Sequence, residues 1–136
     1  MKYLVDVNVI SEATKPLPNP AVVAWLRKHE ADLVLDPVVL GEIRLGILML
    51  PAGKRRAALD AWFGQRVERM VCLSWDAATA LRWAALLAKL RAKGQAMPLK
   101  DSMIAASALI HDLTVATRNV PDFKKAGVRL VDPFAA

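Results

Sequence analysis

Four acidic residues in this sequence have side chains and positions suited to binding a divalent metal ion. They are Asp6, Glu42, Asp101 and Asp122. Carboxylates that lie close together repel one another unless a cation sits among them, and a ligand set made only of oxygen atoms suits Mg²⁺ or Mn²⁺. If the fold brings these four side chains together, they predict a site for one of these ions.

Each of the four acids also has a structural explanation. Asp101 is a negative charge of the kind favoured at the start of a helix, and Asp122 suits a turn or a helix cap. Glu42 lies on an apolar face, where a solvated carboxylate is out of place. Asp6 ends an apolar strand and is the hardest of the four to explain by structure alone. The metal site therefore depends on the fold that positions them.

The expected strands and helices alternate along the chain. Short apolar runs predict strands at residues 2–5, 33–35, 71–73, 114–117 and 128–131. Helical spacing, Pro, Gly and capping residues predict helices at 20–28, 38–50, 53–69, 77–93, 100–111 and 122–125, with Asp76 and Gly94 as caps of the fourth and a loop at 15–20. Such alternation predicts an α/β fold whose parallel sheet is covered by helices on both faces.

This arrangement gives the acids a common location. Asp6 ends the first strand, Glu42 lies in the first turns after the second strand, Asp101 opens the helix before the fourth strand, and Asp122 follows the fourth strand. Ligands of open parallel sheets bind beyond the carboxyl ends of the strands. We therefore expect the four carboxylates at that edge. Another acid, Asp36, is explained by a turn before Pro37.

Composition narrows the class of protein. The chain has 136 residues, of which 55% are hydrophobic and 24% charged, so we expect one domain, 1–136, with a substantial core. The lone Cys72 excludes an internal disulfide, and no apolar stretch is long enough for a signal peptide or a membrane span. These features predict a cytoplasmic protein that does not bind membranes.

The charge distribution favours a nucleic-acid substrate. Without the four candidate ligands, 9 acidic residues remain against 19 Lys and Arg, so the rest of the chain carries +10. A single basic run is usually a solvated helix face, but the overall excess is harder to dismiss. An acidic metal centre inside a basic surface is what hydrolysis of a phosphodiester backbone requires.

Four segments in order along the chain resemble successive motifs of the PIN-domain family, and most closely its VapC/FitB-like toxin branch. They read YLVDVNVISE (3–12), LGEIRLGI (40–47), PLKDSMIAASA (98–108) and ATRNVPDFKKAGVRLVDPF (116–134). The resemblance implies a three-layer α/β/α sandwich in which Asp6, Glu42, Asp101 and Asp122 bind the metal, supported by Asn8, Thr117 and Asn119. It also implies a Mg²⁺- or Mn²⁺-dependent endoribonuclease, the toxin of a type II toxin–antitoxin pair, that forms a homodimer and is blocked by its antitoxin.

Two positions depart from the family pattern, and two other functions compete. Val7 and Val39 stand where relatives often have a hydroxyl residue, which puts supporting hydrogen bonds in question but not the carboxylates. A haloacid-dehalogenase-like phosphatase also has an Asp after its first strand, yet Asn8 replaces the acid that it needs two residues later. The other alternative is a PIN-like module that grips RNA or a partner without cleaving.

Overall fold

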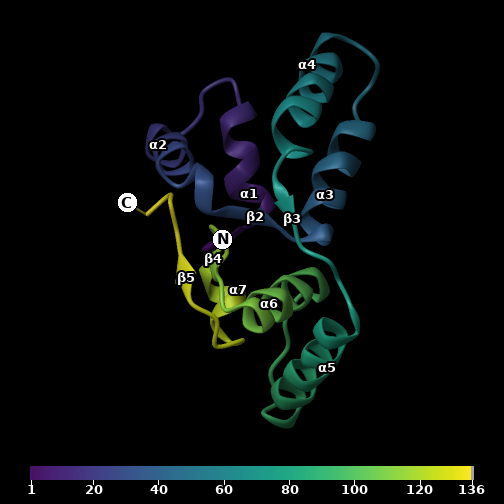
Figure 1. Ribbon diagram of the computed structural model, residues 1–136, viewed down its shortest axis with the longest axis vertical. Coiled ribbons are helices and arrows are strands. Elements are labelled where there is room, and N and C mark those ends of the chain that lie inside the picture. Colours follow the sequence, from purple (N-terminus) through teal and green to yellow (C-terminus); the bar gives the residue numbers. More distant parts are fainter. Residues whose placement is uncertain (136) are drawn as a thin grey trace.

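A parallel β-sheet forms the centre of the protein (Figure 1), in a computed structural model that describes residues 1–135. Within these residues the sheet has five strands in the order β3-β2-β1-β4-β5, and every neighbouring pair is parallel. The strands are β1 (Tyr3–Val5), β2 (Leu33–Leu35), β3 (Val71–Cys72), β4 (Thr114–Ala116) and β5 (Leu130–Val131). The predicted parallel sheet is therefore confirmed, with strands one or two residues shorter than expected in all but one case.

Helices connect every pair of consecutive strands. They are α1 (Val7–Ile10), α2 (Pro20–Lys28), α3 (Pro37–Leu48), α4 (Lys54–Trp62), α5 (Ala77–Ala92), α6 (Leu99–His111) and α7 (Val120–Lys124), with 3₁₀ turns η1 (Ser11–Thr14) and η2 (Glu30–Asp32) and a π-helical turn η3 (Phe63–Val67). The sequence did not predict α1 and η1. The helix expected at 53–69 is confirmed as α4, but it ends in the π-helical turn.

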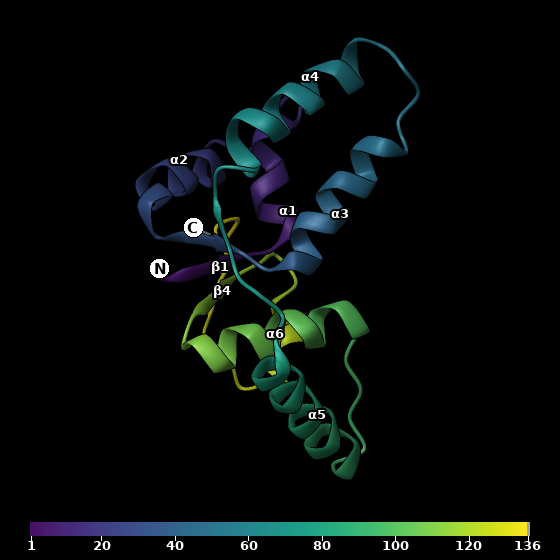
Figure 2. The ribbon, with the colours of Figure 1, turned by 45° about the vertical axis from the view of Figure 1, so that its right-hand side comes forward.

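The strand order places the helices in two layers. Right-handed crossovers from β1 to β2 and on to β3 put α1 to α4 on one face of the sheet, whereas the return to β4 and β5 puts α5 to α7 on the other. Figures 1 and 2 show these two groups above and below the strands. The three-layer α/β/α sandwich is thus confirmed. The direction of winding reverses between β1 and β4, and this switch point is where α/β proteins usually bind ligands.

The helix ends follow the predicted capping residues. The Asn19 side chain accepts a hydrogen bond from the N–H of Ala21 ahead of Pro20, and Asp76 accepts one from the Thr79 N–H at 3.0 Å. Gly94 adopts a φ of +67° just after α5, a conformation that a side chain would strain. These caps fix where the two helices begin and end.

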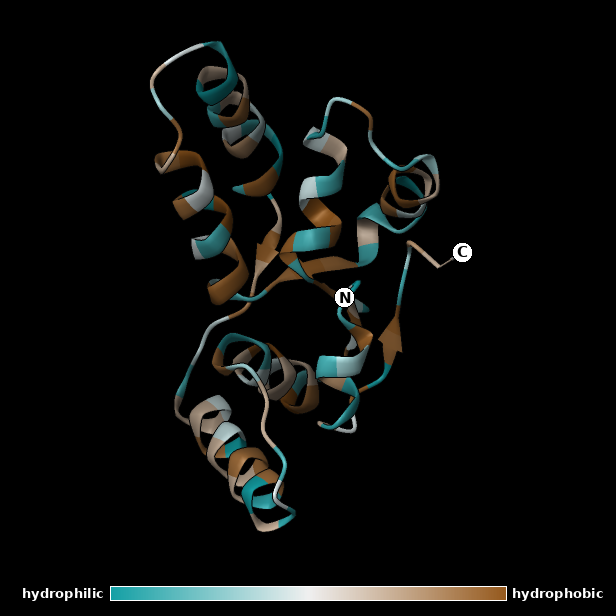
Figure 3. Ribbon diagram, turned by 180° about the vertical axis from the view of Figure 1, so that it is seen from behind, coloured by the Kyte–Doolittle hydropathy of each residue, from teal (hydrophilic) through white to brown (hydrophobic). Residues whose placement is uncertain are grey.

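The core lies between the strands and the two helical layers. Leu4, Val34 and Val115, on the three central strands, are at most 1% exposed. Figure 3 shows these strands as hydrophobic and the helices as a mixture of hydrophobic and hydrophilic residues. Among residues 1–135, no helix is long and apolar enough to cross a lipid bilayer.

Asp36 is fully buried beside this core. It caps α3 by accepting a hydrogen bond from the Val38 N–H at 2.9 Å, and the Ser107 hydroxyl on α6 donates to its other oxygen. Burial raises the pKa of the Asp36 carboxyl, although these hydrogen bonds oppose the rise. The sequence interpretation of Asp36 as a structural turn residue is supported, and its bond to Ser107 additionally joins the two helical layers.

Candidate active site

Asp6 is the most enclosed of the four candidate acids. It directly follows β1, is 3% exposed and caps α1 by accepting the Val7 N–H at 2.8 Å. Its other oxygen accepts hydrogen bonds from the Thr117 hydroxyl at 2.7 Å and from the Asn8 amide at 3.3 Å. Hydrogen-bond donors that follow β1 and β4 therefore hold this carboxylate at the switch point.

The surroundings of Asp6 disfavour its charged form. Burial raises the pKa of the Asp6 carboxyl above its ordinary value of 3.8, and the nearby negative charge of Glu42 raises it further. The hydrogen bonds from Thr117, Val7 and Asn8 act in the opposite direction. Asp6 is thus a buried carboxylate that a neighbouring cation would stabilise.

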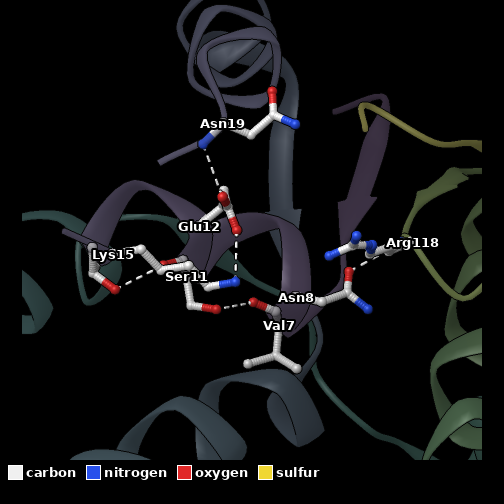
Figure 4. Close-up of polar contacts among 8 residues, drawn as sticks. Val7, Asn8, Ser11, Glu12, Lys15, Asn19 and Arg118 are labelled. Atoms are coloured by element: carbon white, nitrogen blue, oxygen red, sulfur yellow. Dashed lines mark hydrogen bonds and ion pairs between the residues drawn. The ribbon is translucent and has the colours of Figure 1, made fainter. Parts of the chain in front are cut away.

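The supporting residues Asn8, Thr117 and Asn119 link the ends of β1 and β4. The Asn8 side-chain oxygen accepts a hydrogen bond from the Arg118 N–H at 3.1 Å (Figure 4), and the Thr117 hydroxyl accepts one from the Asn119 N–H at 2.9 Å. Asn119 itself is exposed. The structure places Asn8 and Thr117 against Asp6, whereas Asn119 joins the network through its backbone.

Glu42 lies in the first half of α3, with its side chain 17% exposed. Its carboxylate forms an ion pair with the ammonium group of Lys100, in the first turn of α6 on the opposite face of the sheet. The hydrogen bond and charge of Glu42 raise the pKa of Lys100, and the charges of Asp101 and Asp6 add to this. Glu42 therefore belongs to the same electrostatic cluster as the other acids.

Asp101 is affected by the charges of the three other acids. It lies in the first turn of α6, and burial, followed by the charges of Asp6, Asp122 and Glu42, raises its pKa from 3.8 to about 6. The charge of Lys100 opposes this rise. Asp122 lies in the first turn of α7. The charges of the three other predicted acids thus all act on Asp101, which supports the prediction of a common site at this edge.

The donor set fits a hard divalent cation in its chemistry. It consists of carboxylate oxygens that repel one another, and Mg²⁺ and Mn²⁺ prefer such ligands to the nitrogen and sulfur donors typical of Zn²⁺. Within residues 1–135 no three His, Cys, Asp or Glu side chains already stand close enough to hold an ion. The residues therefore fit the metal in type and charge.

The two departures from the family pattern leave Asp6 well supported. Val7 provides its backbone N–H to the Asp6 carboxylate, and Val39 is fully buried in the hydrophobic core. Thr117 and Asn8 supply side-chain donors. The carboxylate consequently keeps three hydrogen-bond donors without a hydroxyl at position 7 or 39.

Lys100 and Arg118 lie at the site but were not predicted as functional. The sequence did contain an indication for Lys100. It directly precedes Asp101 at a helix start, where the helix dipole disfavours a cation. Arg118 stands between Thr117 and Asn119 in the fourth motif, and its guanidinium group lies 4.5 Å from the centre of the Phe134 ring. Lys100 adds positive charge beside the carboxylates, whereas the charge of Arg118 acts on Glu12.

Glu12 is a buried acid outside this cluster. It accepts a hydrogen bond from the Asn19 N–H at 2.9 Å and forms an ion pair with Lys15 at 2.9 Å (Figure 4). These partners lower the pKa of the Glu12 carboxyl, the Asn19 hydrogen bond most strongly. Glu12 thus ties the loop before α2 to η1 and has a structural role.

An apolar groove of about 210 Å³ borders the cluster. Glu42 lines it together with residues of α1, η1, α3 and α4, namely Val7, Ser11, Thr14, Ile43, Gly46, Ile47, Leu59 and Trp62. The groove therefore runs from the carboxylates along the α1–α4 face of the protein.

Comparison with known proteins assigns the family. The sequence model of the PIN-domain family matches residues 3–128, which is most of the chain. The chain belongs to the PIN-domain family, as the motifs indicated.

The relatives lie in the expected branch. The VapC ribonuclease Y4jK of Sinorhizobium fredii is 34% identical over 96% of both chains, and the toxin FitB of Neisseria gonorrhoeae is 35% identical over 96% of this chain and 97% of its own. The crystal structure of FitAcB from Neisseria gonorrhoeae superimposes with a TM-score of 0.88 at 34% identity, covering 98% of this chain and 99% of that one. The predicted resemblance to VapC/FitB-like proteins is confirmed.

Proposed function

We propose that this protein is an endoribonuclease and the toxin of a type II toxin–antitoxin pair, with Mg²⁺ or Mn²⁺ as its cofactor. The observation that carries the proposal is the raised pKa of Asp101, about 6, which burial and then the charges of Asp6, Asp122 and Glu42 cause at the carboxyl edge of the sheet. The similarity to a VapC ribonuclease supports RNA as the substrate.

In this proposal the four carboxylates bind the metal. When bound, the ion neutralises charge on a phosphodiester and makes a water molecule easier to deprotonate. Thr117 and Asn8 hold Asp6 in place, so that the buried carboxylate keeps its orientation. Arg118, exposed beside Asn8, supplies positive charge for the RNA backbone.

Cleavage of RNA by the purified protein tests the function. We expect cleavage with Mg²⁺ or Mn²⁺ that stops on addition of EDTA and is lost in Asp6→Asn and Glu42→Gln. Asp60→Asn and Glu30→Gln make the same chemical changes at exposed positions on other elements and should retain activity. Cleavage that survives both chelation and Asp6→Asn would overturn the proposal.

The apolar groove suggests how an antitoxin acts. A helical or extended antitoxin segment that fills the groove with apolar side chains would bring a basic residue at its end to Glu42 and its neighbouring carboxylates. An Arg or Lys there would compete with the metal. We therefore expect that the groove and the carboxylates together form the inhibitory surface, and that Leu59→Arg weakens inhibition without reducing RNA cleavage.

Exposed leucines support a homodimer. Leu45 and Leu48 on α3 and Leu81 on α5 are 60%, 48% and 73% exposed. These leucines are among the exposed apolar residues that a second copy of the chain could cover. We place the action of the protein in the cytoplasm, with its RNA substrate.

The two other functions receive less support. For a haloacid-dehalogenase-like phosphatase, the residue two positions after Asp6 should be an acid, whereas Asn8 donates to Asp6 and accepts from Arg118 as an amide. A module that binds RNA without cutting it has no need for four crowded carboxylates. Binding without cleavage at any Mg²⁺ or Mn²⁺ concentration would favour that module.

A further inference from the structure

Lys100 occupies a position that its own helix disfavours. It is the second residue of α6, where the exposed N–H groups carry partial positive charge and favour acids over cations. Asp101, directly after it, is the kind of residue expected there. A negative charge near the Lys100 ammonium would offset this unfavourable position.

Glu42 provides that charge from across the sheet. The Lys100 ammonium pairs with the Glu42 carboxylate, and α3 and α6 lie on opposite faces of the sheet (Figure 2). The pair thus spans the carboxyl edge, near enough to Asp101 and Asp6 for their charges to act on Lys100. A cation of the chain itself already neutralises one of the proposed metal ligands.

The two partners differ in exposure. The Lys100 side chain is 65% exposed and the Glu42 side chain 17% exposed. The ammonium group sits on a flexible four-carbon stem and can return to water without disturbing the core. Glu42, on α3, stays at the site.

We propose that Lys100 is an exchangeable counter-ion of the carboxylate cluster. It binds Glu42 in the metal-free protein and leaves when a divalent ion takes the same carboxylate. This inference rests on the proposed metal-dependent function. The ion has to break the Lys100–Glu42 pair before it can use Glu42, so the lysine lowers metal affinity and sets the metal concentration at which the site fills.

Titration calorimetry with Mn²⁺ on the purified full chain, without RNA, tests the exchange. Lys100→Gln should bind Mn²⁺ about three- to tenfold more tightly than the wild type, which is about 0.7 to 1.4 kcal/mol for an ion pair of this exposure. Lys100→Arg keeps the charge and should bind like the wild type. Lys28→Gln removes one exposed positive charge from the end of α2 that leads to the start of β2, and should also have no effect.

Melting temperatures supply the second measurement. Saturating Mn²⁺ should raise the melting temperature of Lys100→Gln by more than that of the wild type, because only the wild type loses the Lys100–Glu42 pair when the ion binds. An equal or weaker Mn²⁺ affinity for Lys100→Gln, or an equal or smaller rise of its melting temperature in Mn²⁺, would overturn the exchange. If the wild type binds no Mn²⁺ at all, the proposed metal-dependent function fails instead.

Discussion

Replacing Asp101 by Asn should stabilise the metal-free protein, because burial and then the charges of three neighbouring acids disfavour the charged carboxylate. The rise of its pKa from 3.8 to about 6 corresponds to a penalty of about 3 kcal/mol for the charged form. The side chain is partly exposed, so water screens part of this penalty, and the variant also loses a favourable charge at the helix start worth about 0.3 to 1 kcal/mol. We expect a net gain of about 1 kcal/mol, or about 3 °C in melting temperature.

This gain depends on pH in a direction that the raised pKa fixes. Between about pH 4 and pH 6 the folded protein holds the Asp101 proton more tightly than the unfolded chain, so the stability contributed at this site falls as pH rises. Above about pH 6 the carboxylate is charged in both states and the difference is constant. The advantage of Asp101→Asn should therefore be small at pH 4 and complete at pH 7.

Calorimetry in EDTA at several pH values, together with an RNA cleavage assay, measures both effects. Asp101→Asn should melt above the wild type at pH 7 and lack nuclease activity, whereas Asp60→Asn, an exposed acid paired with Arg44, should gain no stability. If Asp101→Asn is less stable at pH 7, or if its advantage does not shrink toward pH 4, the reasoning is wrong and Asp101 serves mainly the start of α6.

Three further outcomes are expected. Thr117→Val removes the hydroxyl that donates to buried Asp6. It should lower the free energy of unfolding, measured in urea, by about 1.5 to 3 kcal/mol and slow RNA cleavage. Unchanged cleavage would show that this hydrogen bond does not position Asp6. Ser107→Ala should lower the free energy of unfolding by a similar amount, because buried Asp36 loses a hydrogen-bond donor. It should leave the rate of RNA cleavage unchanged where the protein is folded, and slower cleavage there would contradict a purely structural role for Ser107. Leu45→Glu places a charge on an exposed apolar residue and should shift light scattering at micromolar concentration from dimer to monomer, whereas a wild type that is already monomeric would exclude the homodimer.

Local chemistry predicted most of the fold. The apolar runs that end at Asp6 and Asp36 predicted β1 and β2, and the caps at Asn19 and Asp76 predicted the helix starts. The short α1 and η1 were missed because Asp6 was interpreted as a strand end and a ligand, whereas it also caps the next helix. Asp6 both follows the strand and caps α1, and a pattern of apolar residues indicates only the end of the strand.

The sequence predicted the four acids of the candidate site but not the ion pair between Lys100 and Glu42. The strand ends placed the four acids at one edge, and the raised pKa of Asp101 agrees with that placement. The ion pair between Lys100 and Glu42 joins helices from opposite faces of the sheet, so no local spacing in the sequence indicates it. Such contacts follow from the packing of layers, which the sequence pattern does not specify.

The reversal of strand order between β1 and β4 has a consequence for synthesis of the protein. The central strand β1, which Asp6 follows, is made before its neighbour β4 and the helix bearing Asp122. A nascent chain therefore lacks a complete acid cluster until α7 has left the ribosome. If the cluster is the nuclease centre, the ribosome and its messenger are not exposed to an active enzyme while most of the chain is being translated.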